Sequence, residues 1–298
     1  MNFDFSDLKV AVIGDLMVDN YIIGKSIRQS PEADAPVVLP LENYSKAGGA
    51  ANVCMNIKNL GANVDCYGVI GADKWGNVLM EILDSSGINF FNLSDKKDLK
   101  TTLKKRIYSN GIQVLRIDDE EKTENILLDN IKFDNYDFCI FSDYNKGVIN
   151  NVPNINPISF VDPKKENFLH YKNANIVTPN IIELEKVTKT KLNDVNSIVT
   201  ACNKLIEDNN INYIIAKRGS KGMVVVGEDF YENISAYNVK NPDVTGAGDT
   251  VISVLALVYF KTKDIIHSAR IANKCAAKIV NKEGTNSISI TELNSINL

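Results

Sequence analysis

The sequence is poor in histidine, and its cysteines form no pattern typical of a metal centre or a disulfide framework. Only His170 and His267 occur, each outside a recognisable motif, so we expect no histidine-based metal site. The five cysteines are an odd number, stand singly among apolar neighbours and show no C-x-x-C spacing. We therefore predict reduced core thiols, as in a cytoplasmic protein. They are Cys54, Cys66, Cys139, Cys202 and Cys275.

An excess of positive charge and a long apolar segment are also missing. With 33 Lys and Arg against 37 Asp and Glu, the formal net charge is −4, which argues against a nucleic-acid or anionic-membrane surface. The longest apolar stretch, residues 251–260, is too short to span a bilayer, and residues 1–9 do not read as a signal peptide. We predict a soluble cytoplasmic protein with small-molecule partners, in which a local site must bind any anionic ligand.

What the sequence does contain is an alternation of short β-type runs with helical patterns. This alternation predicts a mostly parallel sheet covered by helices on both faces, within a single domain of 298 residues. Apolar residues fall on one face of the helical patterns at 50–60, 75–83 and 195–206. The expected strands are residues 9–13, 64–69, 138–142, 159–161, 176–178, 213–216 and 223–226.

Two excursions, residues 20–43 and 88–118, carry β-type residues with no helix between them. In the second, residues 101–108 and 114–117 flank the dipeptide Asn110-Gly111, which is a strong hairpin signal. We predict that the two excursions form a small β-sheet that projects from the main domain as a lid over its ligand site. An ordinary antiparallel extension of the main sheet is the alternative.

The segment D-V-T-G-A-G-D at residues 243–249 is the strongest candidate for chemistry. Gly246 and Gly248 permit a tight turn, and the apolar helix that follows points free N–H groups at whatever lies in front, which predicts a phosphate site. Asp249 is unfavourable beside a phosphate unless it takes a proton from a hydroxyl group that attacks the phosphate. The alternative is a first-turn helix acid stabilised by the helix dipole.

Polar residues near the ends of other predicted elements suit a sugar. Asp15 and Asp19, after the first strand, can accept hydrogen bonds from hydroxyl groups, or they are turn and cap acids. Gly48 and Gly49 allow a close approach of the backbone, and Asn52 can both donate to and accept from a polyol. The full G-x-G-x-x-G spacing of dinucleotide-binding proteins is absent here.

Further polar residues follow later strands, on what should be the same rim of the sheet. Lys146 and Lys164 would supply positive charge to a second phosphate, unless they are solvated surface lysines. Asn180 and Glu183 lie one helical turn apart, which suits Mg²⁺ held through water with nucleotide phosphates. A helix N-terminal capping box is the competing interpretation of this pair.

Taken together and in this order, these motifs resemble the PfkB-type, ribokinase-like carbohydrate kinases over nearly the whole chain. The two family signatures are G-G-A-A-N at residues 48–52 and D-V-T-G-A-G-D-T at residues 243–250. The resemblance implies a three-layer α/β/α sandwich with a mostly parallel central sheet and a small β-sheet lid. Within the family the chain is most similar to heptose 7-phosphate kinases, through residues 14–19, 30–33, 48–62, 142–147, 161–164 and 243–251.

The resemblance also implies roles for individual residues. Asp249 would be the catalytic base, and the amides of Gly246, Ala247 and Gly248 would form an anion hole. The implied sugar contacts are Asp15, Asp19, Gly48, Gly49 and Asn52, and Asn180 and Glu183 would organise Mg²⁺. For the sugar's own phosphate the candidates are Lys164, Lys146, Arg28 and Arg106, with Lys164 favoured because it directly follows a strand end.

Nucleotide contacts are implied by position. The family's T-L-G-x-x-G turn appears here as K-R-G-S-K-G at residues 217–222, with two cations in place of Thr and Leu. Residues 273–285 are expected to line the adenine pocket. The implied nucleotide contacts are Asn180, Lys217, Gly219, Gly222, Thr245 and Asn273.

The implied reaction uses ATP and Mg²⁺ to phosphorylate the anomeric hydroxyl of D-glycero-D-manno-heptose 7-phosphate, giving heptose 1,7-bisphosphate for surface-polysaccharide synthesis. Such kinases are often fused to an adenylyltransferase domain, which these 298 residues do not include, so we expect another protein to supply that step. The alternatives are a related kinase for fructose 6-phosphate, fructose 1-phosphate or ribose, a sugar-binding regulator without turnover, and a dinucleotide-dependent oxidoreductase. Activation by a monovalent cation and a homodimer through the lid stay open.

Overall fold

The computed structural model describes residues 2–96, 98–123, 126–239, 242–282, 284 and 286–296, and in this part of the chain the strands form two separate sheets. The large sheet contains β1 (Lys9–Gly14), β4 (Asn63–Gly68), β5 (Asn89–Asn92), β8 (Phe138–Ser142), β9 (Ile158–Asp162), β10 (Ile176–Val177), β11 (Tyr213–Lys217), β12 (Met223–Gly227) and β13 (Phe230–Ile234). The small sheet contains β2 (Leu16–Gln29), β3 (Pro36–Gly49), β6 (Thr102–Ser109) and β7 (Ile112–Asp119). The helices are α1 (Ala50–Asn59), α2 (Lys74–Ser85), α3 (Ile181–Thr188), α4 (Val195–Asn209), α5 (Ala247–Thr262), α6 (Ile265–Ile279) and α7 (Ile290–Asn294).

The large sheet has the order β13-β12-β11-β10-β9-β8-β1-β4-β5. Neighbours from β5 to β11 are parallel, whereas β12 and β13 pair antiparallel at one edge. The chain runs from β1 to β4 and β5 on one side and then returns to β8 on the other side of β1. Ligands of open α/β sheets bind beyond the carboxyl ends of the strands at such a reversal, which places the expected site after β1 and β8.

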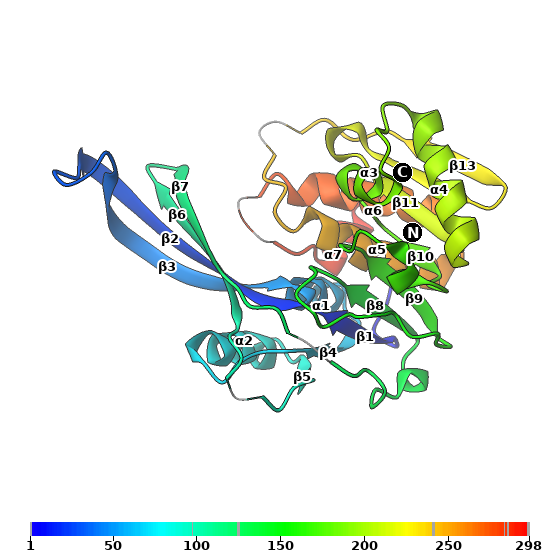
Figure 1. The fold of residues 1–298 in the computed structure, drawn as a ribbon, viewed down its shortest axis with the longest axis horizontal. Helices are drawn as coiled ribbons and strands as arrows, with labels where there is room; N and C mark the ends of the chain where they lie inside the picture. Colours follow the sequence, from blue (N-terminus) through cyan, green and yellow to red (C-terminus); the bar gives the residue numbers. More distant parts are fainter. Residues whose placement is uncertain are drawn as a thin grey trace.

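Both faces of the large sheet are covered. Along β1, Val10 and Val12 pack into the core beneath α1, α2, α5, α6 and α7, while Ala11 and Ile13 pack into the core beneath α3 and α4. All four side chains are fully buried, which is why the strand is a continuous apolar run with no polar alternation. The predicted three-layer α/β/α sandwich is confirmed (Figure 1).

The small sheet projects from the body as a pair of long twisted ribbons, at the left of Figure 1. Its strand order is β3-β2-β6-β7, and the predicted hairpin is present, with Asn110 and Gly111 both at positive φ between β6 and β7. The alternative, an antiparallel extension of the main sheet, is wrong, because β2 pairs with β3 and β6 and not with a strand of the large sheet.

The limits of the two excursions differ from the expected ones. β2 begins at Leu16 and β3 continues to Gly49, so the strands extend inward from residues 20–43 until β3 leads directly into α1. At the start of the second excursion, residues 89–92 form β5, which pairs with β4 at the edge of the large sheet. Residue 97, also in this excursion, lies outside the described residues.

α5 begins at the glycine-rich segment, as the sequence predicts. Its N-cap is Gly246, with φ 76° and ψ 3°, a left-handed conformation that favours glycine. From Asp249 to Val258 every residue is buried, since α5 lies between α1 and α6 against the sheet. The start of α5 is therefore held in place by the core.

Candidate active site

Five strands of the large sheet end in polar residues that form one rim. Asp15 follows β1 and donates its backbone N–H to the carbonyl of Ser142, the last residue of β8, at 3.2 Å. The amide of Asp143, the residue after β8, donates to the carbonyl of Asp162 at the end of β9, and Asn180, after β10, forms a bridge with Lys217 at the end of β11. The N-terminus of α5 lies beside this rim, which is the reversal point of the strand order.

Asp249 lies in the first turn of α5 and is 4 % exposed. The Nδ2 amide of Asn52, in α1, donates to its Oδ2 at 2.7 Å, and the hydroxyl of Tyr144, after β8, donates to its Oδ1 at 2.7 Å. Both donors are neutral, so the carboxylate is buried without a direct cationic partner among the described residues. Three segments that are far apart in the sequence therefore meet at one carboxylate.

The protonation of Asp249 follows from these surroundings. Burial raises the pKa of Asp249 to about 7, against the hydrogen bonds from Asn52 and Tyr144 and the nearby Lys217, which lower it. The charge of Asp162 raises it further. A carboxyl group with a pKa near the working pH is suited to accept a proton during a reaction, because it is partly ionised and still basic.

Gly248, directly before Asp249, lies close to Asp162 and Lys217 at the strand ends. A Cβ added to Gly248 would lie 3.5 Å from both Oδ2 of Asp162 and Nζ of Lys217, which is ordinary contact. Lys217 and Asp162 form an ion pair at 2.5 Å directly before the helix. Of the three amides expected to bind an anion, that of Ala247 donates to the Val244 carbonyl at 3.2 Å in this structure.

Asp15 makes contacts other than the sugar contact that the sequence suggests. It is 1 % exposed, and its carboxylate accepts from the backbone N–H groups of Tyr144, Lys146 and Val148 at 2.7, 3.0 and 3.1 Å. Three of its roughly four acceptor positions are therefore occupied by one loop. In this structure Asp15 shapes the loop after β8.

Gly48 and Gly49 approach the residues after β1 closely. A Cβ on Gly48 would lie 2.8 Å from Oδ2 of Asp19, and one on Gly49, at φ 59°, would lie 2.4 Å from the carbonyl of Asp15. Both distances are too short for a side chain, so these glycines allow the end of β3 to lie close against the start of β2 and Asp15. They place Asn52, one helical turn later, beside Asp249.

The inner face of the small sheet carries the remaining predicted sugar contact. Asp19 and Arg106 face each other from β2 and β6, both less than a tenth exposed, with Nη1 of Arg106 2.7 Å from Oδ1 of Asp19. Lys46 pairs in register with Asp19 from β3, and burial lowers its pKa, against the charges of Asp19 and Asp243. Because Asp243 belongs to the segment before α5, this face is turned toward the start of that helix.

The two lysines that the sequence suggests for a second phosphate each form an ion pair with a glutamate. Lys146 forms an ion pair with Glu120, and Lys164 forms one with Glu183 at 3.1 Å. Arg28 lies at the exposed outer end of β2. Of the four predicted phosphate-binding cations, Arg106 is the one that the structure places on the buried inner face of the small sheet.

Asn180 and Glu183 form the capping box that the sequence left as the competing interpretation. Oδ1 of Asn180 accepts from the Glu183 amide at 2.9 Å, and Oε2 of Glu183 accepts from the Asn180 amide at 2.8 Å. Across the described ranges, no three or more His, Cys, Asp or Glu side chains cluster closely enough to hold a metal ion. A Mg²⁺ ion that keeps several waters and binds phosphate oxygens needs only one or two protein oxygens, and this pair still fits that limited part.

The predicted nucleotide contacts lie around the loops after β11 and before α5. Gly219 and Gly222 have positive φ, and a Cβ on Gly222 would lie 2.0 Å from the carbonyl of Ile234, so that glycine is required by the turn. The amide of Thr245 donates to Asp243, and Nδ2 of Asn273 donates to the carbonyl of Ser235 at 2.8 Å. Of the expected adenine segment 273–285, residues 283 and 285 lie outside the described residues.

Tyr144 and Asp162 contribute to the site but were not predicted as site residues. Both stand in segments that the sequence analysis noted, one directly after β8 and the other at the end of β9. Their positions at strand ends were a signal for them. Their partners, Asp249 for Tyr144 and Lys217 for Asp162, are more than fifty residues away in the sequence, so no local pattern predicts these contacts.

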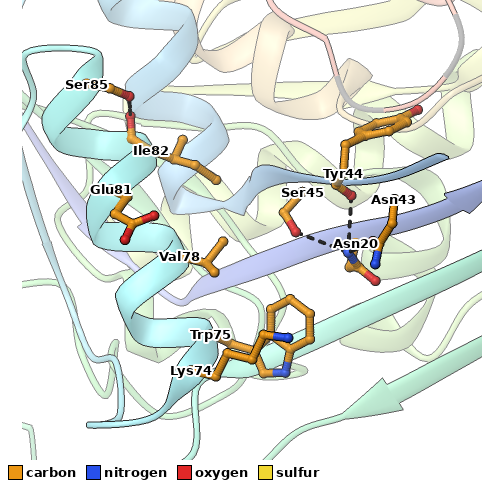
Figure 2. A pocket seen from close by; sticks show the side chains of 10 residues that line it. All are labelled: Asn20, Asn43, Tyr44, Ser45, Lys74, Trp75, Val78, Glu81, Ile82 and Ser85. Carbon is orange, nitrogen blue, oxygen red and sulfur yellow. Dashed lines mark hydrogen bonds between the residues drawn. The ribbon is translucent and has the colours of Figure 1, made fainter.

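Two cavities in the structure lie apart from Asp249. One, of about 560 Å³, lies between the outer face of the small sheet and α2, where Asn20, Ser45 and Trp75 line it (Figure 2). Side chains alternate across a strand, so Asn20 points away from the face that carries Asp19. The other, of about 640 Å³, lies between the end of α4 and the β12–β13 turn.

The five cysteines are free and buried, as predicted, and no helix among the described residues is long and apolar enough to cross a membrane.

Comparison with known proteins shows the family to which the chain is similar. A family model described as pfkB family carbohydrate kinase matches residues 7–292. The chain is 38% identical over 308 residues to the bifunctional protein HldE of Haemophilus influenzae (strain PittEE) and 34% identical over 304 residues to that of Hydrogenovibrio crunogenus. In both comparisons the match covers 97% of this chain and 63% of the relative, so the chain spans about three fifths of the length of these relatives.

Solved structures share the fold at low sequence identity. A ribokinase of Arabidopsis thaliana complexed with ribose and ATP superposes with a TM-score of 0.76 at 18% identity, over 97% of this chain and 99% of that one. Phosphofructokinase-2 of Escherichia coli, in complex with substrates and products, gives a TM-score of 0.76 at 16% identity, over 96% and 97% of the two chains. These likenesses confirm the ribokinase-like fold.

Proposed function

The chain belongs to the pfkB family of carbohydrate kinases, and on that premise we propose that it transfers the γ-phosphoryl group of ATP to a sugar hydroxyl with Asp249 as the base. The observation that carries the proposal is the buried carboxylate in the first turn of α5, held by two neutral donors at 2.7 Å each. A helix N-terminus attracts the phosphate, and the carboxylate beside it can take the proton of the attacking hydroxyl.

The proposed acceptor is the anomeric hydroxyl of D-glycero-D-manno-heptose 7-phosphate, and the product is heptose 1,7-bisphosphate for surface-polysaccharide synthesis. The resemblance in residues 14–19, 142–147 and 161–164 supports this choice, as does the similarity to HldE proteins over 97% of this chain. An acceptor that carries its own phosphate needs a cation away from the transfer point. Arg106 fits that requirement, because a guanidinium group binds phosphate through a two-pronged donor.

In the proposed step, the anomeric oxygen attacks the γ-phosphorus of ATP and forms the new P–O bond. The bond from the γ-phosphorus to the bridging oxygen breaks, and ADP keeps that electron pair. The proton of the hydroxyl passes to Asp249, while the amides at the start of α5 and the ammonium of Lys217 stabilise the charge on the transferred group. Asn52 orients the carboxylate through its 2.7 Å hydrogen bond.

ATP would lie along the rim after β10 and β11, near Lys217, Gly219, Gly222, Thr245 and Asn273. Asn180 and Glu183 would hold Mg²⁺ through water, and the ion would neutralise charge on the phosphates. Lys164, paired with Glu183, belongs to this nucleotide side of the site in our proposal. Activation by a monovalent cation is also proposed, and turnover in K⁺ compared with Na⁺ tests it.

We also propose that the protein is cytoplasmic and forms a homodimer through the small sheet. The support is a group of apolar side chains on its outer strands that are 44–69 % exposed: Leu41, Ile112, Leu115 and Ile117. Leu41 lies on β3 and the other three on β7, the two edge strands of the small sheet, and exposed apolar edge strands favour pairing with another chain. Sedimentation velocity over a range of concentrations tests this, and a monomer at micromolar concentration would contradict it.

The experiment that tests the function is ATP consumption by the purified protein with Mg²⁺ and different acceptors. We expect the highest kcat/KM with D-glycero-D-manno-heptose 7-phosphate, against fructose 6-phosphate, fructose 1-phosphate, ribose and a control without sugar. Preference for another acceptor keeps the role of Asp249 and replaces the substrate. No turnover with any acceptor, from protein that binds ATP, would favour a sugar-binding regulator.

A further inference from the structure

Both oxygens of the Asp249 carboxylate already accept a hydrogen bond in this structure, and the two donors differ in their surroundings. Asn52 lies within α1, where it is 3 % exposed. Tyr144 lies in a loop after β8, and its hydroxyl donates to Oδ1 of Asp249 at 2.7 Å. Nothing in the proposed reaction assigns a role to that hydroxyl.

The loop that carries Tyr144 is fixed in a demanding conformation. Asn145 and Gly147 have φ of 57° and 108°, and a Cβ on Gly147 would lie 1.8 Å from the carbonyl of Thr123. Such a backbone is maintained only where the surroundings hold it. The carboxylate of Asp15 does this, since it accepts from the amides of Tyr144 and Lys146 as well as Val148.

We propose that Tyr144 is a positioning residue for the catalytic base. Its hydroxyl group orients the Asp249 carboxylate and stabilises the charged form, and Asp15 acts on the base only through the loop that carries Tyr144. This inference rests on the proposed function. It assigns to the motif after β8 a role in proton transfer in place of a sugar contact.

The chemistry of the contact explains both effects. A hydroxyl donor stabilises the ionised form of a carboxyl group more than the protonated form, so it lowers the pKa that burial raises. It also fixes the rotation of the carboxylate, because Oδ1 is tied to the loop and Oδ2 to α1. Each oxygen retains a second acceptor direction, and the sugar hydroxyl can donate there.

The test is Tyr144→Phe, which keeps the ring and removes the donor. Loss of a hydrogen bond to a charged group is worth about one pKa unit, so we expect the acid limb of the kcat/KM profile for the acceptor to move up by about one pH unit. On the acid side of both profiles, kcat/KM of Tyr144→Phe would be about tenfold lower than that of the wild type. Above about pH 8 the difference in kcat/KM between the two enzymes would become smaller. The KM for ATP should not change.

Tyr67→Phe is the matched control. It removes a phenol hydroxyl that lies 2.6 Å from the hydroxyl of Tyr136, in a network that ends at Asp65. We expect a wild-type pH profile from this variant. A shift of the same size in both variants would mean that loss of any such hydroxyl disturbs the enzyme, and would overturn the specific role of Tyr144.

A second variant tests the link to Asp15. Asp15→Asn should move the acid limb in the same direction, and the double variant with Tyr144→Phe should be no slower than the slower single variant, since both act through one contact. Effects that multiply would overturn the link.

The outcomes separate this inference from the proposed function. If the wild-type enzyme turns over no acceptor, the proposed function fails. If the wild-type enzyme is active and Tyr144→Phe shows only a raised KM for the sugar at every pH, with the acid limb unmoved, Tyr144 is a sugar contact and the positioning role is wrong.

Discussion

Asp15 and Asp249, at the rim of the large sheet, are held in a different way from Asp19 on the inner face of the small sheet. On the rim, Asp15 and Asp249 are at most 4 % exposed and are bonded to amides and neutral side chains. On the small sheet, Asp19 is paired with a cation, Arg106, and more cations stand on neighbouring strands. The rim is embedded in two hydrophobic cores, whereas the outer strands of the small sheet are largely exposed.

This difference indicates a division of work. A proton acceptor needs a perturbed pKa and a fixed position, which burial in a rigid core provides. Recognition of a charged substrate needs cations that can exchange a protein partner for a ligand, which paired ions on a projecting sheet provide. The rim should therefore control turnover, and the small sheet should control affinity for the acceptor.

The largest effect that would sharpen this comparison is expected from Asp249→Asn. Loss of the base should lower kcat by about 10² to 10⁴, because the sugar hydroxyl no longer has a proton acceptor. ATP affinity, measured by calorimetry, should stay near that of the wild type. Turnover within tenfold of the wild type would show that the buried carboxylate is not the base.

An intermediate effect is expected on the small sheet, from Arg106→Lys. The variant keeps the charge but loses the two-pronged donor, so we expect the KM for a phosphorylated acceptor to rise about tenfold while kcat changes little. The matched control is Arg270→Lys, whose ion pair with Glu232 lies on the exposed surface of α6. It should leave both constants unchanged.

Lys164→Ala distinguishes the two candidates for that phosphate contact. Because Lys164 is paired with Glu183 at the start of α3, we expect this variant to affect ATP more than the acceptor. A larger rise in acceptor KM from Lys164→Ala than from Arg106→Lys would reverse the assignment and weaken the division between rim and small sheet.

The last prediction concerns stability and its dependence on pH, which leaves turnover aside. The pKa of Asp249 is raised from 3.8 to about 7, so the folded protein binds one more proton than the unfolded chain between these values. The contribution of Asp249 to stability therefore falls as pH rises through that window, because the buried group must ionise. Relative to Asp249→Asn, the wild type should therefore lose about 2 to 3 kcal/mol of stability between pH 5 and pH 8, since about two of the shifted pKa units lie in that range.

Calorimetric melting at pH 5, 6, 7 and 8 checks this sign. The Tm of the wild type should rise relative to that of the variant as the pH falls from 8 to 5, where the carboxyl group is protonated in the folded state. A difference independent of pH would mean that Asp249 is not buried as a proton-binding group. Control measurements on Asp264→Asn, a helix cap on the exposed surface, should show no gain at pH 8.

Much of the fold could be predicted because it depends on patterns within single elements. The faces of α1 and α4 follow from the spacing of their apolar residues, and the Asp194 cap of α4 needs only a neighbour three residues away. The hairpin around Asn110 follows from turn chemistry. The capping box of Asn180 and Glu183 was among the stated interpretations for the same reason, since its partners are three residues apart.

The small sheet was predicted less well at its limits. Residues 89–92 have the same β-type composition as the strands of the small sheet, yet they pair with β4 at the edge of the large one. Composition reports that a segment is extended but not which edge it joins. Which sheet the segment joins depends on tertiary structure, because β4 has an unpaired edge next to the end of α2 where residues 89–92 can pair.

From the sequence alone follow the α/β layers, the start of the last long apolar helix at the glycine segment, and Asp249 as the candidate base. Only the packed structure shows that Asp15 shapes a loop, whereas Asp249 is buried between two neutral donors. Asp15 and Asp249 both stand at element ends beside glycines, and they differ in hydrogen-bond partners that lie 105 to 197 residues away. Hydrogen-bond partners at such separations, and the burial that shifts a pKa, exist only once the strands and helices have packed.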